Sequence, residues 1–249
     1  KGVCGSGKSV VALNLAKELG KASVVVPIKN LQKQYEQDYT NRKYLFKNNG
    51  EKLRIKIITG RQNFLCPFIK ENKNIGVEEN TTLDNFGFRN SKNKTNKGAK
   101  DSSCNNSFLP CKIEIKERNA EIIKEYVKKN PKIKGSFELR DVRRMSIAPI
   151  CKYWSPIVPV ELDLNLDDAK QMFYKGLKNK SFIIYGRKQG CGYYDQYESY
   201  LNSDVLIFNS HKYLIETVMN RKPATDIEII DECDEFLDSL SENMNINLN

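Results

Sequence analysis

A glycine-rich octapeptide at the start of the chain constrains its fold more than any other feature. Gly2-Val3-Cys4-Gly5-Ser6-Gly7-Lys8-Ser9 matches the phosphate-binding pattern G-x-x-x-x-G-K-[ST]. In this pattern backbone N–H groups surround the phosphates, the lysine reaches the β and γ phosphates, and the serine hydroxyl ligates Mg²⁺. The sequence therefore predicts an ATP site whose nucleotide-binding residues are Gly2, Gly5, Ser6, Gly7, Lys8 and Ser9.

The residues after this loop predict a helix. Val10, Leu13 and Ala16 follow helical spacing, and Gly20 stands at the position that commonly ends a helix. The phosphates would then lie at a helix N-terminus, where the helix dipole and free N–H groups favour anions. Because the chain begins at Lys1 without a methionine, we expect a fragment that lacks the strand before the loop.

Short apolar runs on both sides of the central region predict a parallel sheet. Such runs suit strands that are buried on both faces, and predicted helices alternate with them. A phosphate loop within this alternation predicts an α/β fold with a doubly wound, RecA-like sheet. The expected strands are 22–26, 53–59, 204–208 and 227–230, and the expected helices are 31–39, 193–201 and 211–219.

Two carboxylates follow the last predicted strand. Asp231 and Glu232 come directly after the apolar run 227–230, at the end of a strand where doubly wound sheets carry their chemistry. Asp231 would hold Mg²⁺ together with Ser9, and Glu232 would orient and deprotonate the attacking water. The expected catalytic residues are therefore Lys8, Asp231 and Glu232.

The chain contains seven cysteines, five of them between the phosphate loop and the acidic pair. An odd number, in a nucleotide-binding chain expected to keep its thiols reduced, disfavours a disulfide framework. No interval among the five is as short as the C-x₂₋₄-C of zinc knuckles, whereas separate thiolates are compatible with an iron–sulfur cluster. Buried apolar cysteines are the alternative, which we favour for Cys4 and Cys233.

Charge and hydropathy limit the partners. The formal net charge of +10 favours an anionic partner such as nucleic acid. No apolar run is long enough to cross a membrane and no signal peptide is present, so we expect an intracellular protein. A loop is predicted over 85–107, and a helix over 114–129 that ends before Asn130-Pro131.

Several segments, in order, resemble motifs of the XPD/DinG group of superfamily 2 DNA helicases, whose first motor domain is interrupted by a four-cysteine iron–sulfur domain. Gly60-Arg61-Gln62-Asn63-Phe64-Leu65-Cys66 resembles the G-R-x-N-Y-x-C run that carries the first cluster ligand. Further resemblances are those of Val26–Tyr35 to motif Ia, Cys151–Trp154 and Tyr185–Tyr193 to the third and fourth ligand contexts, and Asn209–Leu214 to the stretch before the DEAH box.

The resemblance implies the organisation of the chain and its ligands. Residues 1–65 and 192–249 would form the first RecA-like helicase domain, and 66–191 an inserted, mostly irregular or helical iron–sulfur domain. The [4Fe-4S] ligands would be Cys66, Cys111, Cys151 and Cys191, with Cys104 as the alternative to Cys111. Tyr153 and Trp154 would either stack on bases or cover the cluster.

The implied activity is ATP-dependent 5′→3′ unwinding of DNA. Its partners would be single-stranded DNA and duplex junctions, within a larger repair or transcription assembly. The residues expected to contact the single strand are Lys29, Asn30, Gln32, Gln34 and Arg61.

The chain also departs from the family pattern. The DEAH box is Asp231-Glu232-Cys233-Asp234, the phosphate loop has Val3-Cys4 where Pro-Thr is usual, and the customary Trp and Pro around Cys191 are missing. Two alternatives therefore stay open. One is a degenerate nucleic-acid-binding relative that does not hydrolyse ATP, and the other is a zinc-stabilised ATPase that does not unwind.

Overall fold

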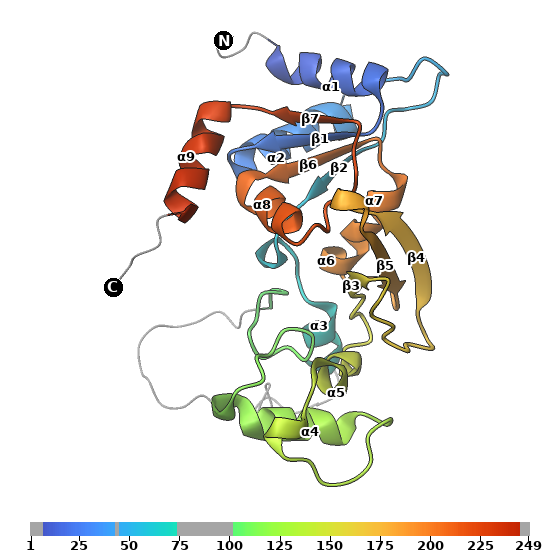
Figure 1. Ribbon diagram of the computed structural model, residues 1–249, viewed down its shortest axis with the longest axis vertical. Helices are drawn as coiled ribbons and strands as arrows, with labels where there is room; N and C mark the ends of the chain where they lie inside the picture. The colour runs from blue at the N-terminus through green and yellow to red at the C-terminus, as the bar shows by residue number, and fades with distance from the viewer. Residues whose placement is uncertain (1–6, 43–44, 74–101, 245–249) are drawn as a thin grey trace.

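A four-stranded parallel sheet forms the upper half of the molecule (Figure 1). The computed structural model describes residues 7–42, 45–73 and 102–244. The strands are β1 (Ala22–Val26), β2 (Ile55–Ile58), β6 (Val205–Asn209) and β7 (Ile227–Ile230), in the order β2-β6-β1-β7. All pairs are parallel, and Val24 of β1 lies opposite both Ile207 and Ile229. The expected α/β class and parallel sheet are confirmed.

Both faces of this sheet are covered, as its apolar strands require. On one face, Val205 and Ile207 pack in a core with Leu13 of α1 (Lys8–Leu19) and Tyr35 of α2 (Lys29–Glu36). The next residues along β6 point to the other face, where Leu206 and Phe208 join a second core that is rich in tyrosine. The helix α2 continues into a π-helical segment, η1 (Gln37–Arg42).

The second core joins the parallel sheet to an antiparallel one. Its strands are β3 (Ile157–Pro159), β4 (Lys170–Lys175) and β5 (Ser181–Gly186), in the order β3-β5-β4. Phe182 and Ile184 of β5 pack in the same core as Leu206. The expectation that 66–191 is mostly irregular or helical is wrong for this part. The sequence signal was weak, because β4 is an edge strand that begins and ends with lysine and keeps one buried residue, Tyr174.

Between β5 and the end of the described residues, short helices and connecting segments alternate with β6 and β7. The helix expected at 193–201 is three short successive turns rather than one helix. The one expected at 211–219 is confirmed as α8, which Asn209 caps by accepting a 2.8 Å hydrogen bond from the Lys212 backbone N–H. The elements are α6 (Gly192–Asp195), η8 (Gln196–Glu198), α7 (Ser199–Asn202), α8 (Ser210–Val218) and α9 (Cys233–Met244).

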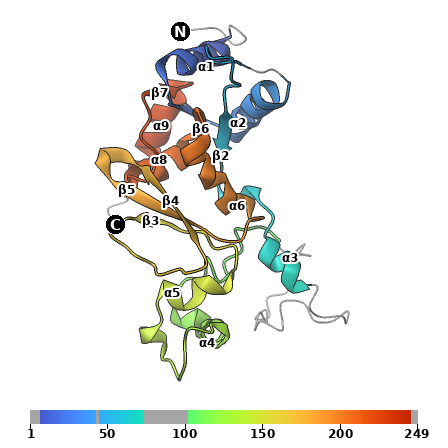
Figure 2. The same ribbon diagram turned by 90° about the vertical axis from the view of Figure 1, so that its right-hand side faces the viewer.

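The lower half holds short helices and most of the cysteines. Figure 2 shows α4 and α5 at the end of the molecule opposite α1. The helix expected at 114–129 begins later, at Ala120, and ends before Asn130-Pro131 as predicted. Most of the loop expected at 85–107 lies outside the described residues. The elements are η2 (Arg61–Asn63), α3 (Pro67–Lys73), η4 (Glu117–Asn119), α4 (Ala120–Lys129), η5 (Leu139–Asp141), α5 (Arg144–Ile147), η6 (Ala148–Ile150) and, between β4 and β5, η7 (Leu177–Asn179).

Candidate functional site

The end of the phosphate loop and the acidic end of β7 lie together. The Lys8 ammonium donates a 2.7 Å hydrogen bond to the Glu232 carboxylate. The Tyr35 hydroxyl donates to Asp231 Oδ2 at 3.4 Å and also hydrogen-bonds Ser9, while burial raises the pKa of Tyr35 to about 12. The structure therefore brings together the expected site residues Lys8, Ser9, Asp231 and Glu232. It adds Tyr35, which sequence reasoning missed. Tyr35 stands at the end of the segment that resembles motif Ia, and no role had been assigned to it.

Local backbone geometry explains these positions. Gly7 has φ 80°, a left-handed conformation that suits glycine, and its carbonyl accepts the 3.0 Å hydrogen bond from Val10 that opens α1. Glu232 also has positive φ, 51°, although a non-glycine residue there costs about 1–3 kcal/mol. Such strain gathers at functional sites, and here it lies at the expected catalytic carboxylate. Gly2, Gly5 and Ser6 are outside the described residues.

The oxygen donors at this site fit Mg²⁺. The Ser9 hydroxyl and the Asp231 carboxylate both contact the Tyr35 hydroxyl, so they lie within reach of one small cation. Hydroxyl, carboxylate and phosphate oxygens are the hard ligands that Mg²⁺ takes in nucleotide sites.

Five buried thiols meet in the lower half of the molecule. The pairing of Phe64–Cys66 with Ser102–Cys104 sets Cys66 beside Cys104 through two backbone hydrogen bonds of 2.8 Å. The sulfurs of Cys104 and Cys191 are 3.7 Å apart. All five belong to one buried core, namely Cys66, Cys104, Cys111, Cys151 and Cys191. Cys233 is exposed on α9, so the apolar burial expected for it is wrong.

The thiols hydrogen-bond one another in two groups. Bonds from Cys104 lower the pKa of both Cys66 and Cys191, and they raise the pKa of Cys104 itself. In the second group, the bond from Cys151 lowers the pKa of Cys111 and raises that of Cys151.

Backbone N–H groups add to this pattern of donors. Those of Phe68 and Ile69 donate to the Cys66 sulfur at the start of α3, and that of Tyr194 donates to the Cys191 sulfur at the start of α6. These hydrogen bonds favour the thiolate forms of Cys66 and Cys191, and thiolate is the form in which cysteine binds a metal. Within the described ranges, no three His, Cys, Asp or Glu side chains are spaced to hold a single metal ion.

Arg61 connects the thiols to the upper half. Its guanidinium donates to Cys111 Sγ at 3.6 Å and to the Tyr194 hydroxyl at 2.8 Å, and it stacks 4.2 Å from the centre of the Tyr193 ring. The hydrogen bond from Cys151 lowers the pKa of Cys111 most, and burial opposes it by raising that pKa. The positive charge of Arg61 is the next largest influence, and it lowers the pKa of Cys111 further. The expected single-strand residue is therefore also a neighbour of the thiols.

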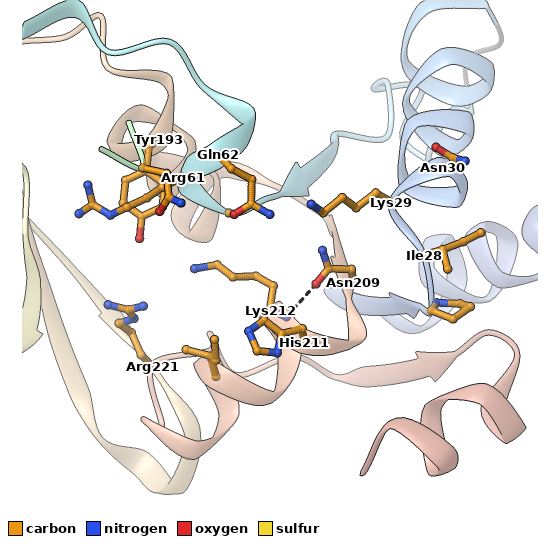
Figure 3. Close-up of a pocket in the computed structure, with 14 residues that line it drawn as sticks. Ile28, Lys29, Asn30, Arg61, Gln62, Tyr193, Asn209, His211, Lys212 and Arg221 are labelled. Carbon is orange, nitrogen blue, oxygen red and sulfur yellow. Dashed lines mark hydrogen bonds between the residues drawn. The ribbon is translucent and has the colours of Figure 1, made fainter. Parts of the chain in front are cut away.

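A cation-lined pocket of about 680 Å³ adjoins Arg61. It lies at the carboxyl ends of β1, β2 and β6, beside the start of α8. Figure 3 shows Lys29, Lys212 and Arg221 reaching the same space from different sides, with Asn209 between Lys29 and Lys212. No carboxylate lines the pocket within the described part of the chain. Its charge therefore favours an anion.

A buried ion network fixes two of these cations. Lys212 donates to Glu216 at 2.7 Å and to the Tyr197 hydroxyl at 2.8 Å, and Arg221 binds both oxygens of Glu216, at 2.5 and 2.7 Å. Burial raises the pKa of the fully buried Glu216, but the two cations outweigh it and hold that pKa below its usual value. Because one carboxylate faces two cations, the network keeps a positive charge at the pocket wall.

Of the five residues expected to contact a single strand, three line the pocket and two do not. Lys29, Asn30 and Arg61 line the pocket. Gln32 is 1% exposed, and its amide donates to the carbonyls of Ile58 and Ile207, so it ties α2 to the sheet instead of facing a ligand. Gln34 is exposed on α2 and is not among the residues that line the pocket.

Sequence reasoning missed Tyr193, Lys212 and Arg221 as parts of this pocket. Tyr193 and Lys212 lie in segments that had been singled out for their resemblance, which was the available signal. No local pattern marked Arg221. His211 also lines the pocket.

Comparison of the chain with protein-family models found no match, and comparison with curated proteins and solved structures found no significant similarity. In the described parts of the chain, no helix has the length and apolarity needed to cross a membrane. The function of the site is therefore inferred from its own geometry.

Removing the Glu216 carboxylate tests the ion network. Glu216→Ala leaves two cations without their buried partner, so we expect the free energy of unfolding in urea at pH 7 to fall by about 3–5 kcal/mol. Because folding lowers the pKa of Glu216, the variant should lose its full amount of stability at a pH above the pKa of Glu216 in the unfolded chain. The difference in stability between the native chain and the variant should shrink as the pH falls through the pKa of Glu216 in the folded chain. Glu138→Ala removes an exposed pair with Arg140 and should change stability by about 1 kcal/mol at most. Equal effects of the two variants would contradict this account.

Proposed function

We propose that this chain is the nucleotide-binding motor domain of an iron–sulfur DNA helicase of the XPD/DinG type. The observation that carries the proposal is the 2.7 Å contact between Lys8 and Glu232. It joins a phosphate loop to an acidic strand end at the carboxyl edge of a parallel sheet, where doubly wound folds bind nucleotides. The cation-lined pocket lies at the same edge, and Arg61 connects that pocket to the thiols. In this proposal the parallel sheet is a RecA-like core.

The ATP site would work by exchange of ion pairs. In the structure Lys8 pairs with Glu232, and both are about one-third exposed, so the pair is weak and a phosphate can replace it. Lys8 would then hold the β and γ phosphates, while Ser9 and Asp231 hold Mg²⁺. Glu232, released from Lys8, would orient the attacking water and accept its proton as the bond to the γ phosphate breaks.

The pocket would hold the backbone of a single strand. Lys29, Lys212 and Arg221 supply positive charge from separate elements, and charge of this kind dominates affinity for nucleic acids. The Tyr193 ring, which Arg61 covers on one side, adds an aromatic surface of the kind that stacks on bases. Because the pocket lies between the nucleotide edge and the thiols, strand binding and ATP turnover would act on shared elements.

Four of the five thiols would hold a [4Fe-4S] cluster. Buried thiols with backbone N–H bonds to their sulfurs provide the soft, charge-stabilised ligands that such a cluster needs. Bound there, the cluster would supply a rigid joint for the lower half. Tyr153 and Trp154 are buried in the same core as the thiols, which favours a covering role over stacking on bases.

Cys66, Cys151 and Cys191 belong to the proposed ligand set, and the fourth ligand is Cys111 or Cys104. The Arg61 guanidinium beside Cys111 favours Cys111, because it would offset the negative charge of a ligated cluster.

Nucleotide binding tests the first part of the proposal. Lys8→Ala should weaken binding of a fluorescent ATP analogue with Mg²⁺ by about ten- to a hundredfold, because it removes a charged hydrogen bond to phosphate. Glu232→Gln should tighten it by about two- to fivefold, because it frees Lys8 from an exposed pair. Lys17→Ala is the control on the same helix, since Lys17 pairs with its neighbour Glu18. Unchanged binding in Lys8→Ala would refute the nucleotide site.

Metal analysis after anaerobic purification tests the cluster. We expect iron and acid-labile sulfide in the native chain, their loss in serine variants of Cys66, Cys111, Cys151 or Cys191, and retention in Cys104→Ser. Cys233→Ser is the control, because Cys233 is exposed and outside the thiol core. If Cys104→Ser loses the iron and sulfide while Cys111→Ser keeps them, the second ligand is Cys104 instead of Cys111. Stoichiometric zinc without sulfide would refute the cluster.

Binding of a short oligothymidylate tests the strand site. Lys29→Ala should weaken binding and lower the slope of log affinity against log salt by about 0.7, the value for one phosphate contact on a single strand. Lys33→Ala is the matched control, because Lys33 is exposed on the same helix but does not line the pocket. The same loss in both variants would show that only net charge matters and that the pocket is not the site.

A further inference from the structure

A second cleft, of about 920 Å³, lies on the lower half and shares no lining residue with the cation-lined pocket. Its walls come from the end of α4, the segment of α5 and η6, the loop between β3 and β4, and the residues after β5. Its volume is near the upper end of the usual range for ligand sites, about 300–1,000 Å³. The proposed function does not use this cleft.

The floor of the cleft is aliphatic. Ile133, Met145, Ile150 and Leu164 line it and are half-buried. Each keeps apolar surface in contact with water, which a ligand with aliphatic groups would cover at a gain of about 25 cal/mol per Å². No aromatic ring is among the described residues that line this cleft.

Buried polar groups hold the walls in place. The Asn130 side chain is buried and donates to the carbonyls of Met145 and Ser146, at 3.5 and 3.2 Å. The Arg187 guanidinium donates to the carbonyls of Pro149 and Cys151, at 3.3 and 2.9 Å. These bonds join the separate segments of the wall, so the cleft is formed before any ligand arrives.

The rim is cationic. Five cationic side chains line the cleft against two carboxylates. Arg187 uses its charge inside the wall by pairing with Asp168 at 2.8 Å. Asp167 pairs with Lys132 at 2.7 Å, but both side chains are largely exposed, so the pair is weak and an incoming carboxylate can compete for Lys132. The cationic side chains are Lys129, Lys132, Lys152, Arg187 and Lys188.

We propose that this cleft binds an acidic peptide segment of a partner protein, with its carboxylates on the lysine rim and its aliphatic side chains on the floor. Charge complementarity selects an anionic partner. The floor then separates a peptide from a nucleic acid. Bases bind through stacking on aromatic rings, which the cation-lined pocket offers in Tyr193 and this cleft does not, whereas leucine, isoleucine or valine side chains suit an aliphatic floor.

Selection from a library of short random displayed peptides tests this proposal. Peptides that bind the native chain are kept, and those that also bind Lys152→Glu protein are discarded. We expect the remaining sequences to combine Asp or Glu with Leu, Ile or Val. The selected peptide, labelled with a fluorophore, is then titrated by anisotropy against variants of the cleft.

Three variants give distinct expected results. Asp167→Asn should tighten peptide binding by about two- to fivefold, because it removes the carboxylate that competes for Lys132. A misfolded variant would not bind more tightly. Lys152→Glu should weaken binding about tenfold, because it places a like charge beside the peptide. Lys180→Glu, in the turn between β4 and β5 and outside the cleft, makes the same charge change and should have no effect.

Two results would overturn the proposal. The first is a peptide result. Either the selected peptides are not enriched in acidic and aliphatic residues, or they bind the native chain and the Asp167→Asn variant with the same affinity. The second is displacement of the peptide by a short oligothymidylate that still acts on Lys29→Ala protein, because this would identify the cleft as a nucleic-acid site.

Discussion

The parallel pairing of β1 with β6 and β7 is the constraint on which the rest of the molecule depends. Parallel strands end at one edge of a sheet, so whatever follows each strand is gathered there. The last contact along β7 is the Asp231 N–H donating to the Val25 carbonyl at 2.9 Å. That bond holds Asp231 at the edge of the sheet, and the next residue, Glu232, contacts Lys8 at the start of α1. Asn209 at the end of β6 and Lys29 after β1 reach the same edge and line the pocket.

Arg61 gives this edge a physical connection to the thiols. One guanidinium contacts a cysteine sulfur, a tyrosine hydroxyl and the face of a tyrosine ring. A change in charge on the thiols therefore acts on a residue that also lines the pocket. Arg61 is half-buried, so its interaction with the thiols is less screened than one between fully exposed charges. Arg61 is thus a direct contact between the thiols and the pocket at the sheet edge.

The cation-lined pocket and the cleft on the lower half differ in how they hold charge. The pocket at the sheet edge keeps its positive charge by burying Glu216 between Lys212 and Arg221, so these cations are fixed before any ligand binds. The cleft on the lower half carries exposed lysines over an aliphatic floor. Fixed charge beside an aromatic ring suits a strand of phosphates and bases. Exposed charge over aliphatic surface suits a peptide.

The sequence by itself determined the elements whose signal is local. Continuous apolar runs identified the four strands of the parallel sheet. The types of residue at Lys8, Ser9, Asp231 and Glu232 predicted one site, and the structure brings these residues together. Tertiary structure alone decided which polar residues face the pocket. Gln32 and Lys29 lie on the same turn of α2, yet one is buried against strand carbonyls and the other lines the pocket. Nor could local pattern predict that Cys104 and Cys191 would meet, or that Arg221 would share a carboxylate with Lys212. Spacing along the chain specifies helices and strands, whereas contacts between distant segments depend on the path of the whole chain.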